Sequence, residues 1–411
     1  MELESRPVCV FVDPSAGVKG VHNSAFVHQL QQFGASGSGT SVEFGFAVHR
    51  SCSAGTRNGL AQAQVAVLPV FEVDGYQLTG EPIAPSAWTP YVATLRENFL
   101  ELFIQVRSRW PKRRVSLVYH TMSWEHLLAL GSALRQWPTG GGLTHHAFAM
   151  YWPGMAEDGQ TIEPALRLQY KQALSALQGW QGFYLYTGTV AYQQALASLL
   201  PGLNVRLHPF FLDDWVALRL PAKPLQAESV RKILAYSGEV RDVKGFDGLH
   251  AFIPRLLQRF SAAQKLVVHV PLQQEKIVAA HEKTWQALQA LAAKDARIEL
   301  LCGFLGAEQI KALVASCDVV SLAYDAEFYK YKTSGFLWLA GRLGVPCIVP
   351  EGTWMAREAA RLGVPAWCTN LEPLHQESDR AYAQAVLQPF WPWLMLVCLL
   401  DKGEFVQLST G

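Results

Sequence analysis

The chain has 411 residues, of which 50% are hydrophobic and 17% are charged. This length and composition predict a globular protein with two or three domains and sizeable cores. The formal net charge of +1 gives no basic surface of the kind that nucleic-acid binding requires, so no nucleic-acid partner is expected.

The first half of the chain alternates strand-like and helix-like segments. Short apolar runs bounded by turn residues predict strands, and longer amphipathic runs predict helices. The predicted strands cover residues 8–12, 41–48, 64–71, 115–120, 146–151, 182–186 and 205–207. The predicted helices cover residues 24–33, 91–109, 123–134, 163–177 and 190–200. This alternation is typical of a parallel sheet that helices cover.

A segment of poor periodicity with two prolines, residues 213–228, predicts a linker, after which the alternation restarts. The second set of predicted strands covers residues 232–236, 265–270, 298–301, 319–323 and 345–349. The second set of predicted helices covers residues 248–260, 276–293, 307–315, 336–343 and 356–362. We therefore expect an α/β protein with two Rossmann-like domains, residues 1–220 and 221–385, facing each other across a ligand cleft at the carboxyl edges of the strands.

The C-terminal segment, residues 386–411, is expected to form an apolar helix or tail that packs back on the N-terminal domain. Its apolar run Phe390–Leu400 contains Pro392 and is too short to span a bilayer, so it predicts a buried helix or a peripheral contact with the inner face of a membrane. The seven cysteines contain no Cys-x-x-Cys pair, which favours reduced thiols over disulfides or a zinc site. The N-terminal segment is acidic and lacks the long apolar core of a signal peptide, so a cytoplasmic location is expected.

A polar loop followed by an apolar helix, within residues 318–355, has the features of an anion-binding site. The loop supplies Tyr324, Lys332, Thr333, Ser334 and Gly335. Free backbone N–H groups at the helix start, a hydroxyl, a glycine that allows close approach and lysine side chains suit the diphosphate of a nucleotide. The alternative is a plain helix N-cap at Thr333 or Ser334.

A second glycine-containing loop, residues 238–245 with sequence GEVRDVKG, follows the predicted strand at residues 232–236. Beginning at Gly238, it offers Arg241, which has a forked pair of donors, and Lys244, which carries a point charge; both groups suit a diphosphate. The alternative is a solvated loop with ordinary surface charges.

These segments resemble the nucleotide-sugar-binding domain of two-domain glycosyltransferases of the GT-B fold. The resemblance rests on Asp318 before a strand, the Tyr324-Asp325 loop, the Thr333-Ser334-Gly335 helix start and the Gly344-Val345-Pro346 strand start. The upstream segment ILAYSGEVRDVKGFDGLHAF is similar to the first strand, loop and helix of that domain. The likeness covers roughly residues 230–360 and extends to the N-terminal half only by layout.

The resemblance implies a metal-independent glycosyltransferase that moves a sugar from a nucleotide-activated donor to an acceptor hydroxyl on a glycan, a lipid-linked glycan or a protein, in polysaccharide or glycoconjugate biosynthesis. Many retaining members have a glutamate on the helix after the second loop, where this chain has Leu337, Trp338 and Leu339. That departure argues against the retaining two-glutamate mechanism and keeps open the alternative of a non-catalytic binding subunit. A sugar-nucleotide epimerase of the same architecture, which would use the same diphosphate loops, is the other alternative.

Inverting members of the fold often place a general base in the N-terminal domain. An imidazole can take up a proton near neutral pH, and His22, in the loop after the first strand, is the first candidate. His120 at the end of another strand is its rival, and Asp13 is the third candidate. The adjacent His145 and His146 point to opposite faces of a strand and poorly share one metal ion, so no metal site and no cofactor are predicted.

Overall fold

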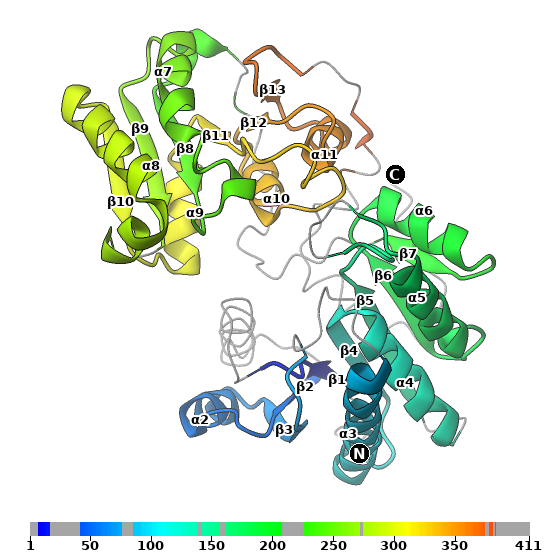
Figure 1. The fold of residues 1–411 in the computed structure, drawn as a ribbon. Helices are drawn as coiled ribbons and strands as arrows, with labels where there is room; N and C mark the ends of the chain where they lie inside the picture. The colour runs from blue at the N-terminus through cyan, green and yellow to red at the C-terminus, as the bar shows by residue number, and fades with distance from the viewer. Residues whose placement is uncertain are drawn as a thin grey trace. The chain divides into compact units, whose positions relative to one another are not determined.

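The computed structural model describes residues 7–16, 42–75, 85–138, 142–156, 161–207, 223, 226–271, 274–374, 378–380 and 383. Its contacts divide the chain into two compact units, with the division between Asp213 and Asp214 (Figure 1). This division and the predicted boundary at residue 220 both fall in a segment outside the described residues. The predicted helix at residues 24–33 and the tail at 386–411 lie outside the described residues too.

Unit 1 contains a seven-stranded parallel sheet in the order β3-β2-β1-β4-β5-β6-β7. Its strands are β1 Val8–Val12, β2 Glu43–His49, β3 Ala66–Phe71, β4 Val115–Met122, β5 Leu143–Ala149, β6 Phe183–Thr187 and β7 Val205–Leu207. Its described helices are α2 Ala54–Gln62, α3 Pro85–Arg109, α4 Trp124–Gln136, α5 Pro164–Leu177 and α6 Val190–Leu199.

Strand β1 shows why this sheet has a core on both faces. Val8, Val10 and Val12 join the cluster formed with α3, α4, α5 and α6, whereas Cys9 and Phe11 join a second cluster that includes Leu60 of α2. Successive side chains of a strand point to opposite faces, so an uninterrupted apolar run such as VCVFV is typical of a parallel strand buried on both sides.

Unit 2 contains a six-stranded parallel sheet in the order β10-β9-β8-β11-β12-β13 (Figure 1). Its strands are β8 Lys232–Ser237, β9 Lys265–Val270, β10 Ile298–Cys302, β11 Val319–Ser321, β12 Cys347–Val349 and β13 Ala366–Cys368. Its described helices are α7 Leu249–Arg259, α8 Gln274–Lys294, α9 Ala307–Ala315, α10 Gly335–Arg342 and α11 Trp354–Leu362, with the short 3₁₀ helices η2 Ala227–Ser229 and η3 Asp242–Lys244. Among the described residues, no helix is long and apolar enough to cross a membrane.

The strand order confirms the predicted α/β class and locates the position in each sheet where a ligand is expected. In both units the order reverses beside the first strand, between β1 and β4 in unit 1 and between β8 and β11 in unit 2. Ligands of doubly wound sheets bind outside the carboxyl ends of the strands at such a switch point. The residues that follow β1, β4, β8 and β11 are therefore the first to examine.

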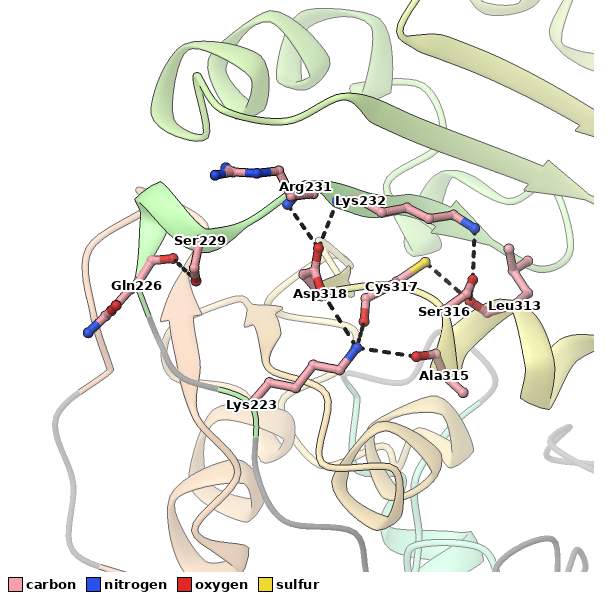
Figure 2. Close-up of polar contacts among 10 residues, drawn as sticks. All are labelled: Lys223, Gln226, Ser229, Arg231, Lys232, Leu313, Ala315, Ser316, Cys317 and Asp318. Atoms are coloured by element: carbon pink, nitrogen blue, oxygen red, sulfur yellow. Dashed lines mark hydrogen bonds and ion pairs between the residues drawn. The ribbon is translucent and has the colours of Figure 1, made fainter.

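Asp318 lies at the opposite, amino end of the unit 2 strands, where it has a structural role (Figure 2). Its Oδ2 accepts hydrogen bonds from the backbone N–H groups of Arg231 and Lys232, at 2.8 and 2.9 Å. Lys223 Nζ lies 3.7 Å from Oδ1 and donates to the Ala315 carbonyl at 3.2 Å. The acidic residue before the strand thus fixes the start of β8 beside the start of β11, away from the carboxyl edge.

Apart from the two short 3₁₀ helices, one α-helix and one strand of the described elements were not predicted from the sequence. Helix α2 contains two glycines in AGTRNGLAQ and buries only Leu60, but the Ser53 hydroxyl caps it by accepting from the Thr56 amide. Strand β13 is the three-residue segment Ala366–Cys368, and we did not predict a strand there. Helix α3 also begins at Pro85 rather than near residue 91.

Candidate functional site

The two loops expected to hold a diphosphate lie in contact at the switch point of unit 2. The Asp325 amide donates to the Val243 carbonyl at 2.9 Å. Gly245 has a φ of 77°, and a Cβ atom added to it would lie 2.1 Å from the Ala323 carbonyl oxygen. Only glycine permits both this backbone conformation and this close approach, so residues 238–245 and the start of the 324–335 loop form one continuous surface.

The first loop places its two cations differently. Lys244 Nζ lies beside Gly238, at 3.5 Å from where a Cβ of that glycine would be, and burial lowers its pKa, with Glu239 opposing that decrease and Arg241 adding to it. Arg241 is exposed, and its Nη1 lies 3.8 Å from a Glu239 carboxylate oxygen. Burial is the main cause that disfavours the Lys244 ammonium, and a bound anion would offset that cost.

The second loop combines aromatic, hydroxyl and cationic groups. Tyr324 and Tyr329 are buried with their ring centroids 4.6 Å apart. Burial raises the pKa of Tyr324, and a hydrogen bond with the Ser334 side chain partly opposes this. Lys332 Nζ lies 3.5 Å from the Phe328 ring centroid, a cation–π contact that keeps the ammonium at this edge.

The start of α10 differs from a plain capped helix. Ser334 occupies the N-cap position, but its hydroxyl makes no capping hydrogen bond, since it contacts Tyr324 instead. Thr333 and Gly335 are exposed. The Ser334 hydroxyl therefore does not cap the first turn of α10, where the Leu337 amide donates to the Ser334 carbonyl at 3.1 Å. The first amides of this helix start are of the kind that can bind an anion.

Two of the three candidate bases meet at the switch point of unit 1. Asp13 directly follows β1, and His120 lies near the end of β4. His120 Nε2 is 3.3 Å from Asp13 Oδ2, and both side chains are 2% exposed. A carboxylate beside an imidazole orients the ring and stabilises its protonated form. The first candidate, His22, lies outside the described residues.

Further polar residues surround this pair, and we did not predict them from the sequence. Ser15 donates its backbone N–H to Asp13 Oδ1 at 2.8 Å and its hydroxyl to Asp74 Oδ1 at 2.6 Å. His126 Nδ1 contacts the Ser123 hydroxyl and accepts from the Ser123 amide at 3.3 Å. Asp74 lies three residues after the end of β3, and its place in the loop after a predicted strand was the one signal that could have indicated it.

Glu125, in the first turn of α4, is completely buried. Neither carboxylate oxygen makes a hydrogen bond of normal geometry to another described residue. Burial raises its pKa to about 7, and weaker contacts to its own backbone and to the Ser123 side chain oppose this only in part. Burial therefore disfavours the ionised form, and the folded protein holds this proton to a higher pH than an exposed glutamate would.

The histidines considered as metal ligands point apart. His145 Nδ1 lies 2.9 Å from the Tyr119 hydroxyl, and His146 Nδ1 lies 3.1 Å from the Tyr186 hydroxyl. Those tyrosines belong to the two clusters on opposite faces of the sheet, so the pair cannot share an ion.

The described residues contain one other group with metal-ligand chemistry, Asp242, Asp247 and His281, whose ligand atoms lie within 4.8 Å of one another. His281 Nδ1 is 3.0 Å from Asp247 Oδ1, which also accepts from the Thr284 hydroxyl at 3.3 Å. These bonds tie the 238–247 segment to α8, and we assign the group this structural role.

A buried glutamate lies close to α10, although it comes from the next helix. Glu358 of α11 is 2% exposed, and its Oε1 accepts from Trp338 Nε1 at 3.1 Å. Trp338, one of the three apolar residues at this part of α10, therefore binds a buried carboxylate through its indole N–H.

No protein-family model matches the sequence, and no curated protein matches it either. Among solved structures, the N-terminal domain of trehalose-6-phosphate phosphatase from Candida albicans is similar, with a TM-score of 0.51 and 12% identity over 96% of this chain and 90% of that one. Trehalose-6-phosphate synthase OtsA has a TM-score of 0.51 and 10% identity over 87% and 86% of the two chains. A UDP-forming trehalose-phosphate synthase from Burkholderia xenovorans has a TM-score of 0.50 and 13% identity over 89% and 88%. These likenesses cover 87–96% of this chain and confirm the fold, a pair of Rossmann-like α/β units of the GT-B type.

Proposed function

We propose that this protein is a glycosyltransferase that moves a sugar from a nucleotide-activated donor to an acceptor hydroxyl. The observation that carries the proposal is the docking of residues 238–245 on the start of the 324–335 loop at the β8/β11 switch point. This contact gathers cations, hydroxyls and a helix N-terminus at one edge, which is the chemistry that a nucleoside diphosphate needs.

In this proposal unit 2 binds the donor. Lys244 and Arg241 neutralise the diphosphate, and amides at the start of α10 donate to its oxygens. When the acceptor oxygen bonds to the anomeric carbon, the bond from that carbon to the diphosphate oxygen breaks and the leaving group takes both electrons. Fixed positive charge at the leaving group stabilises this transition state. Lys332 supplies further positive charge at the same edge.

Unit 1 would bind the acceptor and remove its proton. The Asp13–His120 pair accepts the proton of the attacking hydroxyl, and Asp13 stabilises the imidazolium that forms. The protein's own cations carry the charge compensation, so the reaction is expected to proceed without a metal ion and to persist in a chelator. A cytoplasmic location and membrane contact through Phe390–Leu400 remain predictions, as do the cleft between the domains and the biosynthetic pathway.

Nucleotide binding followed by product analysis tests the proposal. Calorimetry with the diphosphates of uridine, guanosine, thymidine and cytidine should identify one preferred nucleotide. Incubating its sugar derivatives with acceptors then separates three outcomes, namely a transferred sugar, an isomerised or hydrolysed sugar nucleotide as an epimerase would give, and binding without turnover. Lys244→Ala should weaken binding, whereas Lys294→Ala, an exposed lysine at the end of α8, is the charge-matched control. A protein that binds none of the four nucleotides contradicts the proposal.

A further inference from the structure

The 324–335 loop begins with a compact turn that leads to the start of α10. The Asp325 carboxylate accepts from the Phe328 amide at 2.7 Å, and the Asp325 carbonyl accepts from the Tyr329 amide at 3.0 Å. One end of this turn is anchored on the first loop, because the Asp325 amide binds the Val243 carbonyl. Lys332 and the first residues of α10 follow the turn, so their position depends on how its other end is held.

The other end of the turn is held by α11. Arg357 donates from Nη2 to the Lys330 carbonyl at 2.5 Å and from Nη1 to the Gly352 carbonyl at 2.8 Å. The Trp354 amide also donates to the Tyr329 carbonyl, at 3.2 Å. Lys330 lies in the segment after β11 and Gly352 in the segment after β12, so one guanidinium joins two neighbouring segments at the carboxyl edge of the sheet. The planar fork of donors in arginine suits such a two-point contact.

Helix α11 is a firm support for this contact. Its Trp354 ring packs against the Trp338 ring of α10, with the ring centroids 5.3 Å apart. Trp338 Nε1 also donates to the buried Glu358 of α11, and the Thr353 hydroxyl caps the start of α11. Because α10 and α11 are fixed to each other, a loop that Arg357 holds on α11 is also held relative to the start of α10.

Helix α11 itself gains little from Arg357. This residue is the fourth of the helix, and the partial positive charge of a helix N-terminus disfavours a cation in the first turn. The first turn of α11 has no acidic residue that would compensate. Burial adds to the cost, since it lowers the pKa of the guanidinium against the opposing effect of Tyr331. The carbonyl groups that Arg357 joins therefore explain its position better than the stability of the helix does.

We propose that Arg357 is a positioning residue for nucleotide binding, which holds the 324–335 loop where Lys332 and the first amides of α10 act on the diphosphate together. The inference rests on the proposed function, because this loop is part of the proposed donor site. Without the guanidinium, the link between Lys330 and Gly352 is lost immediately before Lys332, and fewer molecules hold the loop in the shape that binds. The apparent affinity of a ligand falls in proportion to the fraction of molecules that are competent to bind it.

Calorimetry with the preferred nucleoside diphosphate tests the effect on binding. Arg357→Ala should weaken binding about tenfold, as a tenfold smaller competent fraction would, and should raise KM for the sugar donor with little change in kcat. Arg255→Ala is the matched control, because Arg255 is also an exposed arginine on a helix of unit 2, where it donates to the Thr369 carbonyl at 3.3 Å. Equal affinities of the two variants overturn the inference and leave the proposed function intact. A wild-type protein that binds no nucleotide refutes the proposed function itself.

Hydrogen exchange of the nucleotide-free proteins separates positioning from other roles of Arg357. In Arg357→Ala the amides of residues 326–335 should exchange faster than in wild type, while those of α11 and the rest of unit 2 exchange at the wild-type rate. Weaker binding with unchanged exchange in this loop would make Arg357 a direct ligand of the nucleotide. Faster exchange throughout unit 2 would make it a general stabiliser of the fold. Either result overturns the positioning role.

A conservative variant provides a second arm, which also serves if Arg357→Ala does not fold. Arg357→Lys keeps the charge and a long stem but lacks the fork of donors, so it can bind one of the two carbonyl groups at a time. It should therefore recover only part of the nucleotide affinity and of the loop protection. Full recovery of both with lysine would show that the charge alone is sufficient, which contradicts the two-point contact.

Discussion

Replacing Gly245 by alanine should separate the two loops of the donor site. The added Cβ would lie 2.1 Å from the Ala323 carbonyl oxygen, where real Cβ contacts below 3.0 Å are essentially never seen. Both partners are main chain, so neither can rotate away, and the loops must move apart by about 1 Å because a close-packed interior offers no spare volume. That movement also breaks the Asp325–Val243 hydrogen bond.

The cost has three parts. Alanine in the left-handed region costs about 1 kcal/mol, overpacking typically costs 1–3 kcal/mol, and the lost backbone hydrogen bond contributes about 1 kcal/mol. We therefore expect the free energy of unfolding to fall by about 3–5 kcal/mol. Gly352→Ala is the control, because Gly352 has a φ of 74° but nothing within 4 Å of the added Cβ, and it should lose only about 1 kcal/mol.

Denaturant titration of the two variants measures this difference, and calorimetry with the preferred nucleoside diphosphate measures its effect on binding. Gly245→Ala should bind nucleotide more than tenfold more weakly even where it remains folded, because Lys244 and the α10 start no longer share one surface. If Gly245→Ala loses no more stability than Gly352→Ala and binds nucleotide normally, the loops are not in contact and the donor-site argument is wrong.

Four further outcomes are expected. Lys244→Ala should weaken nucleotide binding by about 10- to 100-fold, since a charge-assisted contact is worth about 1.5–3 kcal/mol; unchanged calorimetric affinity in the folded variant excludes its role. His120→Gln should lower transfer by about 100- to 10,000-fold with donor affinity preserved, and so should Asp13→Asn; near-normal turnover in both would move the base elsewhere. Glu125 holds its proton up to pH about 7 in the folded state but loses it near the ordinary value of 4.5 when unfolded, so stability falls as pH rises between these values. Glu125→Gln should therefore be more stable than wild type by about 3 kcal/mol at pH 8 and by little at pH 4, as denaturant titrations at both pH values would show. Asp318→Ala should reduce the free energy of unfolding by about 2–3 kcal/mol without changing the nucleotide affinity of the folded protein, and a binding defect at full stability would contradict its structural role.

The local pattern of the sequence determined the class and order of the elements. Uninterrupted apolar runs such as residues 8–12 predict strands buried on both faces, and the restart of the alternation after residue 228 predicts a second α/β unit. The loops at residues 238–245 and 324–335 could be identified because glycine, hydroxyl and basic residues after a strand have a local chemical meaning. Helix α2 contains two glycines and lacks a clear apolar period, and the Ser53 cap stabilises its start. Strand β13 was not predicted either, and its pairing with β12 places it in the sheet.

Only the tertiary structure decided which residues act together. The sequence offered three candidate bases in separate segments, and the pairing of β1 with β4 brings Asp13 and His120 within 3.3 Å of each other. The sequence could not show that Gly245 packs against Ala323, that Asp318 binds backbone N–H groups at the amino end of the strands, or that Glu125 is buried. Each of these depends on strand order and register, which arise from long-range packing between residues far apart in the chain. The chemistry of single loops is therefore local, whereas the composition of a site is a property of the fold.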